Sequence, residues 1–312
     1  LRAEVRFGHR ITGLITEGDC LTGFHVSGPE GDYSLETGCG VLAIGHSARD
    51  TFEMLHHAGI PMESKRFSLG VRIEQLQQEI TRSQYGAEIA GLPPASYKVS
   101  CHLENGRSAY SFCVCPGGQV VAAASEPGRL CTNGMSLYAR DRENINGGLL
   151  VGIGPEDFGT APLSGMYYQR ELEAAAFRLG GGDYRAPAQL VGDFLAQKPS
   201  TGPGRITPSY LPGVTWTDLH LCLPPMITDT LHEAIPLLGK KLQGYDDPEA
   251  VLTAIESRSS SPVRILRDET GQSVLRGLYP CGEGAGYAGG IMSAAADGMR
   301  VAEHILEELR NG

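Results

Sequence analysis

The sequence predicts an α/β protein, α+β overall, in which strand–turn–helix units at both ends flank a central region of short antiparallel strands and helices. At the C-terminal end, an apolar run (274–280) leads into five glycines between 282 and 290, and a helical pattern follows over 291–309. At the N-terminal end, the continuous apolar run 39–44 precedes a helical stretch over 48–58. Between these ends, short apolar segments separated by turn residues are typical of antiparallel strands.

A small meander is predicted ahead of the run 39–44. Alternating apolar residues predict strands over 3–7, 10–15, 21–26 and 33–35. Gly18–Asp19 is a hairpin signal between the second and third of these. The run 39–44 lacks polar alternation, as expected for a strand that is buried on both faces.

The central region changes character from Phe67 onward. Strands are predicted over 67–73, 97–102, 108–113, 119–123 and 149–153, and helices over 74–84, 164–179, 223–238 and 248–256. Pro116–Gly118 marks a tight turn. The segment 126–146 is rich in polar residues and glycine, so it is predicted to be a long loop of the kind that often forms lids or binding segments.

Charge and hydropathy exclude several function classes. The formal net charge is −10, with 26 Lys and Arg against 36 Asp and Glu, and no basic cluster is present. Nucleic acid and anionic membrane surfaces are therefore not expected as partners. No apolar run approaches the roughly 18 residues that a membrane span needs. The first ten residues lack the apolar core of a signal peptide, so a cytoplasmic location is expected.

The eight cysteines include no CxxC pair, although Cys113 and Cys115 form a CxC. In a strand these two side chains point to the same face, and a zinc site needs a second close pair that the sequence lacks. We therefore expect free, mostly buried thiols and no metal site.

The glycines after the last apolar run match a known fingerprint only superficially. Gly284, Gly286 and Gly289 satisfy G-x-G-x-x-G, the dinucleotide-binding pattern. That pattern needs a second strand after the helix, with an acidic residue about 20 positions on. The given sequence ends at Gly312, which weakens both a pyrophosphate role for these glycines and a single-Rossmann NAD enzyme as an alternative.

The segment 277–303 has a more specific resemblance, carried by the words GEGAGYAGGI and SAA.DG. It resembles the C-terminal flavin-contacting segment of glutathione-reductase-like flavoproteins with two dinucleotide-binding domains. The wording is most similar to bacterial FAD-dependent (NAD- or FAD-utilising) dehydrogenases. The resemblance implies that Glu283 hydrogen-bonds the ribityl chain and that the backbone of 288–291 faces the pyrimidine edge of the flavin. The alternative is a tight strand-to-helix turn without a ligand.

The cofactor contacts implied by this resemblance form two sets. They are Gly282, Glu283, Ala288, Gly289, Gly290 and Ile291, followed by Ala43 and Gly45. A helix N-terminus aimed at the ring would stabilise negative charge that develops on reduction, an effect worth about 0.3–2 kcal/mol. The second set lies in the words Val41–His46, which depart from the family pattern at Ile44, where Thr is usual, and at His46, where Gly is usual.

Three further residues are candidates for contact with a substrate. His46 has a pKa range suited to a catalytic base, although a lone loop histidine is more often structural. Arg72 and Arg140 could anchor an anionic substrate, although each alone is more often a surface or ion-pair arginine.

Taken together, the resemblance implies a partial Rossmann-like FAD-binding domain at 1–59 and 263–312, discontinuous and incomplete. An antiparallel-sheet and helical substrate or cap domain at 60–262 would be inserted in it. In the family a βαβ unit with the true glycine fingerprint precedes the meander. Because no early strand here carries that motif, we expect a fragment that is inactive and binds FAD poorly.

The expected function of the full-length protein is that of an FAD-dependent oxidoreductase or dehydrogenase acting on a small-molecule substrate. NADH or NADPH is the expected electron donor. The alternative is a non-catalytic binding or regulatory module that retains flavoprotein architecture. An apolar edge left at strand 39–44 would favour a homodimer.

Overall fold

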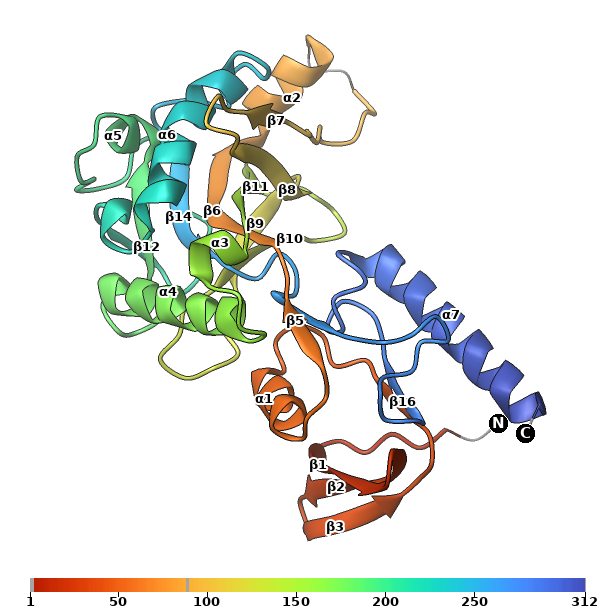
Figure 1. Cartoon of the computed structure of the whole chain (residues 1–312). Helices are drawn as coiled ribbons and strands as arrows, with labels where there is room; N and C mark the ends of the chain where they lie inside the picture. The colour runs from red at the N-terminus through yellow and green to blue at the C-terminus, as the bar shows by residue number, and fades with distance from the viewer. Residues whose placement is uncertain (1–2, 88–89, 312) are drawn as a thin grey trace. The chain divides into compact units, whose positions relative to one another are not determined.

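The computed structural model describes residues 3–87 and 90–311, which form two units (Figure 1). The first unit takes its residues from Leu1–Phe67, Gly154–Tyr167 and Ser260–Gly312, and the second from Ser68–Ile153 and Tyr168–Ser259. Together they make a mixed α/β protein with one large mixed sheet. The assignment of these units as a cofactor domain and an inserted substrate domain stays a prediction.

The first unit begins with the predicted meander. Strands β1 (Arg10–Glu17), β2 (Cys20–Gly28) and β3 (Gly31–Glu36) form an antiparallel sheet in that order. The strand predicted over 3–7 is wrong, because this segment has no ladder partner in the structure and its apolar side chains Val5 and Phe7 are exposed. Alternation without a burying neighbour does not define a strand.

The two ends of the chain meet in a small parallel sheet, which contains strands β4 (Gly40–Leu42) and β16 (Leu278–Pro280). The prediction that the two chain ends share a domain requires the segments 39–45 and 274–282 to contribute to one sheet, and β4 and β16 meet this requirement. The prediction of burial on both faces is wrong, because Val41 is 48% exposed. A parallel strand is usually covered on both faces, and among the described residues β4 pairs only with β16.

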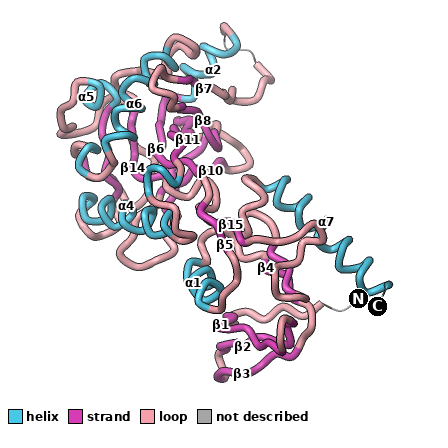
Figure 2. The backbone as a smooth tube through the Cα atoms, in the orientation of Figure 1, coloured by secondary structure: helices cyan, strands magenta, loops and turns pink. Residues whose placement is uncertain are grey.

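Other elements complete the first unit. They are α1 (Arg49–His57), β5 (Met62–Ser64), α3 (Pro155–Phe158), β15 (Val263–Ile265) and α7 (Ile291–Asn311). Strands β5 and β15 pair antiparallel. Helix α7 packs on β16 and the residue after it, since Val301 and Ile305 contact Tyr279 and Cys281. Figure 2 shows the loop that leads into α7. The glycine-rich turn after β16 leads directly into the N-terminus of α7.

The second unit is built on a seven-stranded mixed sheet of order β13-β12-β14-β6-β11-β8-β7. Its strands are β6 (Phe67–Leu76), β7 (Ser100–His102), β8 (Ser108–Cys115), β11 (Asn144–Ile153), β12 (Ala186–Leu190), β13 (Val214–Trp216) and β14 (Val251–Glu256). The antiparallel prediction holds for several pairs, but β12 and β13 run parallel.

Helices and a hairpin accompany this sheet. The helices are α2 (Gln77–Tyr85), α4 (Ser164–Gly180), α5 (Val191–Leu195), the 3₁₀ turn η1 (Leu219–Leu221) and α6 (Pro225–Gly239). Strands β9 (Gly118–Ala122) and β10 (Thr132–Ser136) pair antiparallel. The long loop predicted over 126–146 is therefore wrong in its middle, where β10 lies, and at its end, where β11 begins at Asn144.

The helix predicted over 248–256 is also wrong. Residues Val251–Glu256 form β14, in which all six residues are buried between β12 and β6. A short apolar run buried on both faces has no polar alternation, so its sequence does not distinguish a strand from a buried helix.

Candidate functional site

The glycine-rich turn between β16 and α7 lies against the loop that follows β4. At Gly284, an added Cβ would lie 2.5 Å from the carbonyl oxygen of Gly45, so the two backbones touch. The turn is also tied to the neighbouring strand β15, because Ile265 N–H donates to the carbonyl of Ala285 at 3.1 Å. The packing of the chain itself therefore explains the glycine at 284.

Gly289 and Gly290 differ from Gly284 because nothing in the chain requires them to be glycine. An added Cβ at Gly289 would meet no atom within 4 Å, and at Gly290 the nearest is Ser293 Oγ at 3.9 Å. Neither residue has a left-handed φ. Both are exposed and stand immediately before the first turn of α7. The space above them is open, and the absence of side chains leaves the backbone accessible there.

The other predicted contacts in this turn have different surroundings. Ala288 is buried, whereas Ile291 is 90% exposed at the start of α7. Gly282 has a left-handed φ of +74°, and its N–H donates to Asp297 Oδ2 at 2.7 Å. Because that N–H is already engaged, Gly282 cannot offer it to a cofactor in this conformation.

An ion pair of Arg267 and Asp297 supports the turn. The guanidinium donates to both carboxylate oxygens, at 2.6 and 2.9 Å, and also to the carbonyl of Pro280 at 2.8 Å. It lies 3.8 Å from the centroid of the Tyr287 ring. Hydrogen bonds from Arg267 lower the pKa of Asp297, against the opposing effect of burial. Sequence reasoning missed this pair. Asp297 lies in the word SAA.DG, but Arg267 is 30 positions away and belongs to no motif, so nothing in the sequence connects the two.

His46 and Glu283 come together beside the turn. The distance from His46 Nδ1 to Glu283 Oε1 is 3.0 Å, and the two side chains are 13% and 30% exposed. The atoms are close enough for an ion pair when the imidazole is protonated, but they are not aligned as a hydrogen bond. Nearby, burial lowers the pKa of Lys65, an effect that Arg264 reinforces and Glu283 opposes. Lys65 was not among the sequence predictions.

The cofactor contacts predicted after β4 are Ala43 and Gly45, and they lie in the loop beside the glycine-rich turn. Gly45 has a left-handed φ of +64° and contacts Gly284. Ala43 is exposed in the same short loop. The structure thus brings Gly45, His46, Glu283 and Gly284 together within the first unit, while Gly289, Gly290 and Ile291 lie further along the turn. Their contact with a cofactor stays a prediction.

The arginine candidates both belong to the second unit. Arg72 on β6 is fully buried, where its Nη1 lies 3.0 Å from Glu256 Oε2 and its Nη2 donates to the carbonyl of Cys113 at 2.9 Å. This position fits the ion-pair alternative rather than a substrate anchor. Arg140 is exposed and has a φ of +51°, so its role in substrate binding stays a prediction.

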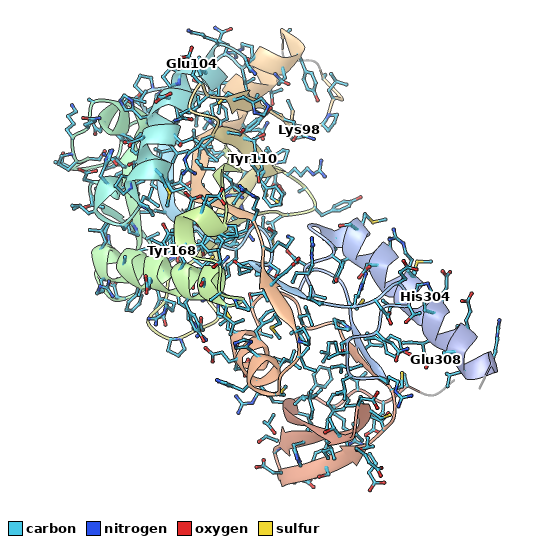
Figure 3. All side chains as sticks on the ribbon, viewed as in Figure 1. Lys98, Glu104, Tyr110, Tyr168, His304 and Glu308 are labelled. Atoms are coloured by element: carbon cyan, nitrogen blue, oxygen red, sulfur yellow. The ribbon has the colours of Figure 1, made fainter. Side chains whose placement is uncertain are left out.

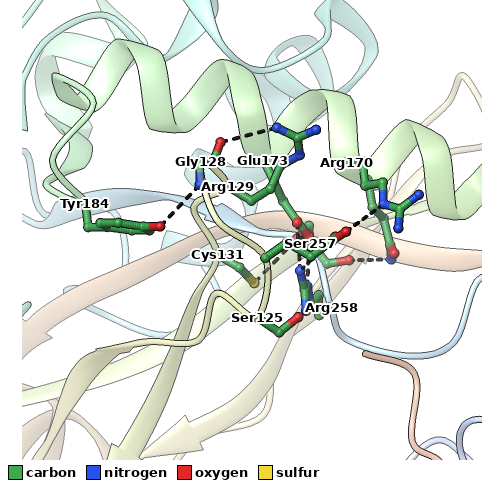
Figure 4. Close-up of polar contacts among 11 residues, drawn as sticks. Ser125, Gly128, Arg129, Cys131, Arg170, Glu173, Tyr184, Ser257 and Arg258 are labelled. Carbon is green, nitrogen blue, oxygen red and sulfur yellow. Dashed lines mark hydrogen bonds and ion pairs between the residues drawn. The ribbon is translucent and has the colours of Figure 1, made fainter. Parts of the chain in front are cut away.

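A second buried ion pair lies in the same unit, between Glu173 on α4 and Arg258 (Figure 4). Arg258 donates to the two carboxylate oxygens at 2.9 and 2.8 Å, and Ser257 Oγ donates to one of them at 2.7 Å. Further hydrogen bonds to the polar atoms of a buried ion pair offset the cost of removing its charges from water. We therefore assign this cluster to the core.

The C-terminal half of α7 carries a further polar group (Figure 3). Glu308 accepts hydrogen bonds from Tyr279 and from Gln272 Nε2, and His304 Nδ1 lies 2.8 Å from the carbonyl of Thr270. These contacts fix the helix against β16. They lie toward the opposite end of the helix from the glycines at 289 and 290.

The cysteines are free, and four of the eight are buried: Cys101, Cys131, Cys222 and Cys281. Within residues 3–87 and 90–311, no three His, Cys, Asp or Glu side chains are grouped to hold a metal ion. In the same ranges, no helix combines the length and apolarity that crossing a membrane requires.

Comparison with known proteins places the chain in a family. Residues 66–259 match the family described as FAD-dependent protein, C-terminal domain-like. The chain therefore belongs to that family of FAD-dependent proteins. The matched segment nearly coincides with the second unit, so the predicted cofactor contacts in the first unit lie outside it.

One relative is a curated protein from Clostridium beijerinckii, described as uncharacterized. It is 52% identical over 273 residues, which cover 86% of this chain and 51% of that protein. The chain thus spans about half the length of this relative.

Two solved structures show weaker similarity. Anhydrotetracycline hydroxylase OxyS from Streptomyces rimosus is 19% identical, with a TM-score of 0.23 over 49% of this chain and 22% of that one. A triple mutant of the flavin-dependent brominase Bmp2 is 12% identical, with a TM-score of 0.32 over 95% and 49%. TM-scores this low do not establish a common fold.

Proposed function

We propose that this chain is part of an FAD-dependent oxidoreductase and that the turn between β16 and α7 contacts the flavin ring. The observation that carries the proposal is the open space at Gly289 and Gly290, beside a helix N-terminus, in a member of an FAD-dependent family. A bound flavin would supply hydride and electron transfer, and the protein would supply position and electrostatics.

The residues of the turn divide this task. The exposed backbone at Gly289, Gly290 and Ile291 would face the pyrimidine edge of the ring, where the first N–H groups of α7 would favour negative charge. Glu283 would accept a hydrogen bond from the ribityl chain. His46 Nδ1, 3.0 Å from Glu283 Oε1, would help to position that carboxylate on the side of the turn next to Gly45.

A titration of this chain with riboflavin and with FAD, followed by amide NMR shifts, tests the assignment. We expect shifts at residues 288–291 and similar affinities for the two ligands, because the proposed contacts are to the ring and the ribityl chain. If the glycines at 284, 286 and 289 instead held the pyrophosphate, FAD would bind far more tightly than riboflavin.

Gly289→Val supplies the matching variant, with Gly202→Val as its control. Gly202 likewise has no atom within 4 Å of an added Cβ and no left-handed φ, but it lies in the second unit. We expect about a tenfold loss of riboflavin affinity, equivalent to 1.4 kcal/mol, for Gly289→Val alone. Equal affinity in both variants would contradict the site.

The second candidate is a non-catalytic module that binds flavin without turnover. Anaerobic addition of NADH or NADPH separates the oxidoreductase from the module. The protein used is flavin-loaded, contains this sequence and has the length of the relative. Bleaching of the flavin absorbance supports the oxidoreductase. A flavin that stays oxidised with both donors supports the module.

A further inference from the structure

We propose that Arg267 and Asp297 are positioning residues that lock the glycine-rich turn to α7, and so set the surface offered at Gly289 and Gly290. The inference rests on the proposed function, because it concerns the same surface. It concerns two residues that contact no predicted ligand atom themselves and act through the backbone that they hold.

The pair joins three parts of the polypeptide. Asp297 lies in the second turn of α7, and Arg267 lies just after β15. Both side chains are nearly buried, with 5% and 13% exposure. One guanidinium thereby ties α7 to the end of β16, through its hydrogen bonds to Asp297 and to the carbonyl of Pro280.

The same pair holds the turn at both of its ends. Asp297 Oδ2 accepts the N–H of Gly282 at 2.7 Å, at the start of the turn. Arg267 lies 3.8 Å from the ring of Tyr287, near its end. The residues between these two points are thus fixed relative to the helix axis, and Gly289 and Gly290 follow directly after the second point. Charge-assisted and bidentate hydrogen bonds are the strongest available for such a link.

This arrangement also changes the role of Gly282. Gly282 has a left-handed φ, and its N–H donates to Asp297. We infer that Gly282 supports the cofactor surface through this bond rather than as a donor to the flavin. Small errors in the placement of a contact surface are costly, because binding geometry tolerates only fractions of an ångström.

The test compares Asp297→Ala, Asp297→Asn and Arg267→Lys in this chain, with Glu156→Ala as the matched control. Glu156 pairs with Arg66 at 2.6 Å on the surface of the same unit, and both side chains are well exposed. Amide shifts and hydrogen exchange at Gly282, Gly289 and Gly290 are measured without ligand. Riboflavin affinity is then measured on the folded proteins.

We expect Asp297→Ala to release the Gly282 amide, to shift Gly289 and Gly290, and to lower riboflavin affinity about tenfold. Asp297→Asn keeps an acceptor for Gly282, so it should recover much of the Gly282 protection while losing the charge that pairs with Arg267. Arg267→Lys keeps the positive charge but cannot bind the carboxylate in a bidentate way. Its riboflavin affinity should therefore lie between those of the two Asp297 variants. Glu156→Ala should match the wild type.

The outcomes separate the two hypotheses. Folded Asp297 and Arg267 variants that keep wild-type shifts at Gly289 and Gly290, or wild-type riboflavin affinity, overturn the positioning role even if their stability falls. If Gly289→Val binds like the wild type, or if the wild type binds no flavin, the proposed function fails and this inference fails with it. If Asp297→Ala does not fold, Asp297→Asn and Arg267→Lys decide the question.

Discussion

Gly117–Gly118 and Gly289–Gly290 are both adjacent glycine pairs at tight turns, but their surroundings differ. At Gly117, with a φ of +49°, an added Cβ would overlap the carbonyl of Arg140. At Gly118 it would lie 2.5 Å from the carbonyl oxygen of Met135. The chain itself leaves no room for a side chain at the first pair. At Gly289, by contrast, an added Cβ would meet no atom within 4 Å.

The difference offers a way to separate two reasons for glycine in a turn. A glycine required by folding is surrounded by its own chain or has a left-handed backbone. A glycine that faces a ligand has neither constraint in the ligand-free protein. The two kinds predict opposite responses when a methyl group is added, and the following substitutions test this from the largest expected loss of stability to the smallest.

Gly117→Ala should cause the largest loss. The new methyl group meets the Arg140 backbone, and alanine does not readily adopt the left-handed φ. We expect a loss of about 3 kcal/mol or more in the free energy of unfolding, in the range of other strained or overpacked positions. Urea unfolding measures it. A loss below about 1 kcal/mol would show that the neighbouring loop yields easily.

Gly284→Ala should have an intermediate effect. Its backbone conformation accepts alanine, but the Cβ would lie 2.5 Å from the carbonyl oxygen of Gly45. Separating the two loops should cost about 1–3 kcal/mol, as overpacking does elsewhere. Urea unfolding gives the loss, and amide shifts at Gly45 and His46 should reveal the displacement. Unchanged shifts there would argue that the close approach is relieved somewhere else.

The turn and its helix could be predicted from sequence because glycine spacing and apolar periodicity are local signals. The pairing of 39–45 with 274–282 was also accessible, since strands at the two ends both lead into turns and helices. The strand at residues 251–256 could not be predicted, because a fully buried strand lacks the alternation of apolar and polar residues that would identify it. Strand β10 was missed because its residues are polar and its pairing with β9 depends on tertiary contacts.

The candidate site shows the same limit. Gly289, Gly290 and Glu283 could be named from their motif, whereas the pairing of Arg267 with Asp297 could not. Ion pairs between distant segments leave no spacing in the sequence, and an arginine at position 267 resembles any surface arginine. Arg72 illustrates the converse, because its sequence context gave no sign that it would be fully buried against Glu256.

Acid should weaken the link that holds the turn. The pKa of Asp297 is lowered below its usual 3.8, chiefly by hydrogen bonds from Arg267. A carboxyl with a lowered folded-state pKa contributes stability above its unfolded pKa, and that contribution is lost as pH falls through the folded value. Asp297→Asn should therefore be less stable than the wild type at pH 7. The difference in the free energy of unfolding should become smaller below about pH 4. A gap that stays constant with pH in urea unfolding would contradict the charged pair.

Gly289→Ala should change stability least and is the sharpest test of the comparison. The added methyl group meets no atom within 4 Å, and the backbone conformation is open to alanine. Replacing glycine at such a position restricts the unfolded chain, so we expect stability to be unchanged or raised, by up to about 1 kcal/mol. Gly202→Ala, with equally open surroundings, should respond in the same way.

The two variants should differ only when flavin is added, because the methyl group at 289 stands where the ring edge would approach the backbone. Riboflavin affinity should then fall for Gly289→Ala alone. Urea unfolding together with riboflavin titration measures both quantities. A clear loss of stability at 289 would place this glycine with Gly117 as a residue that folding requires, and an unchanged affinity would remove the reason to assign it to a ligand.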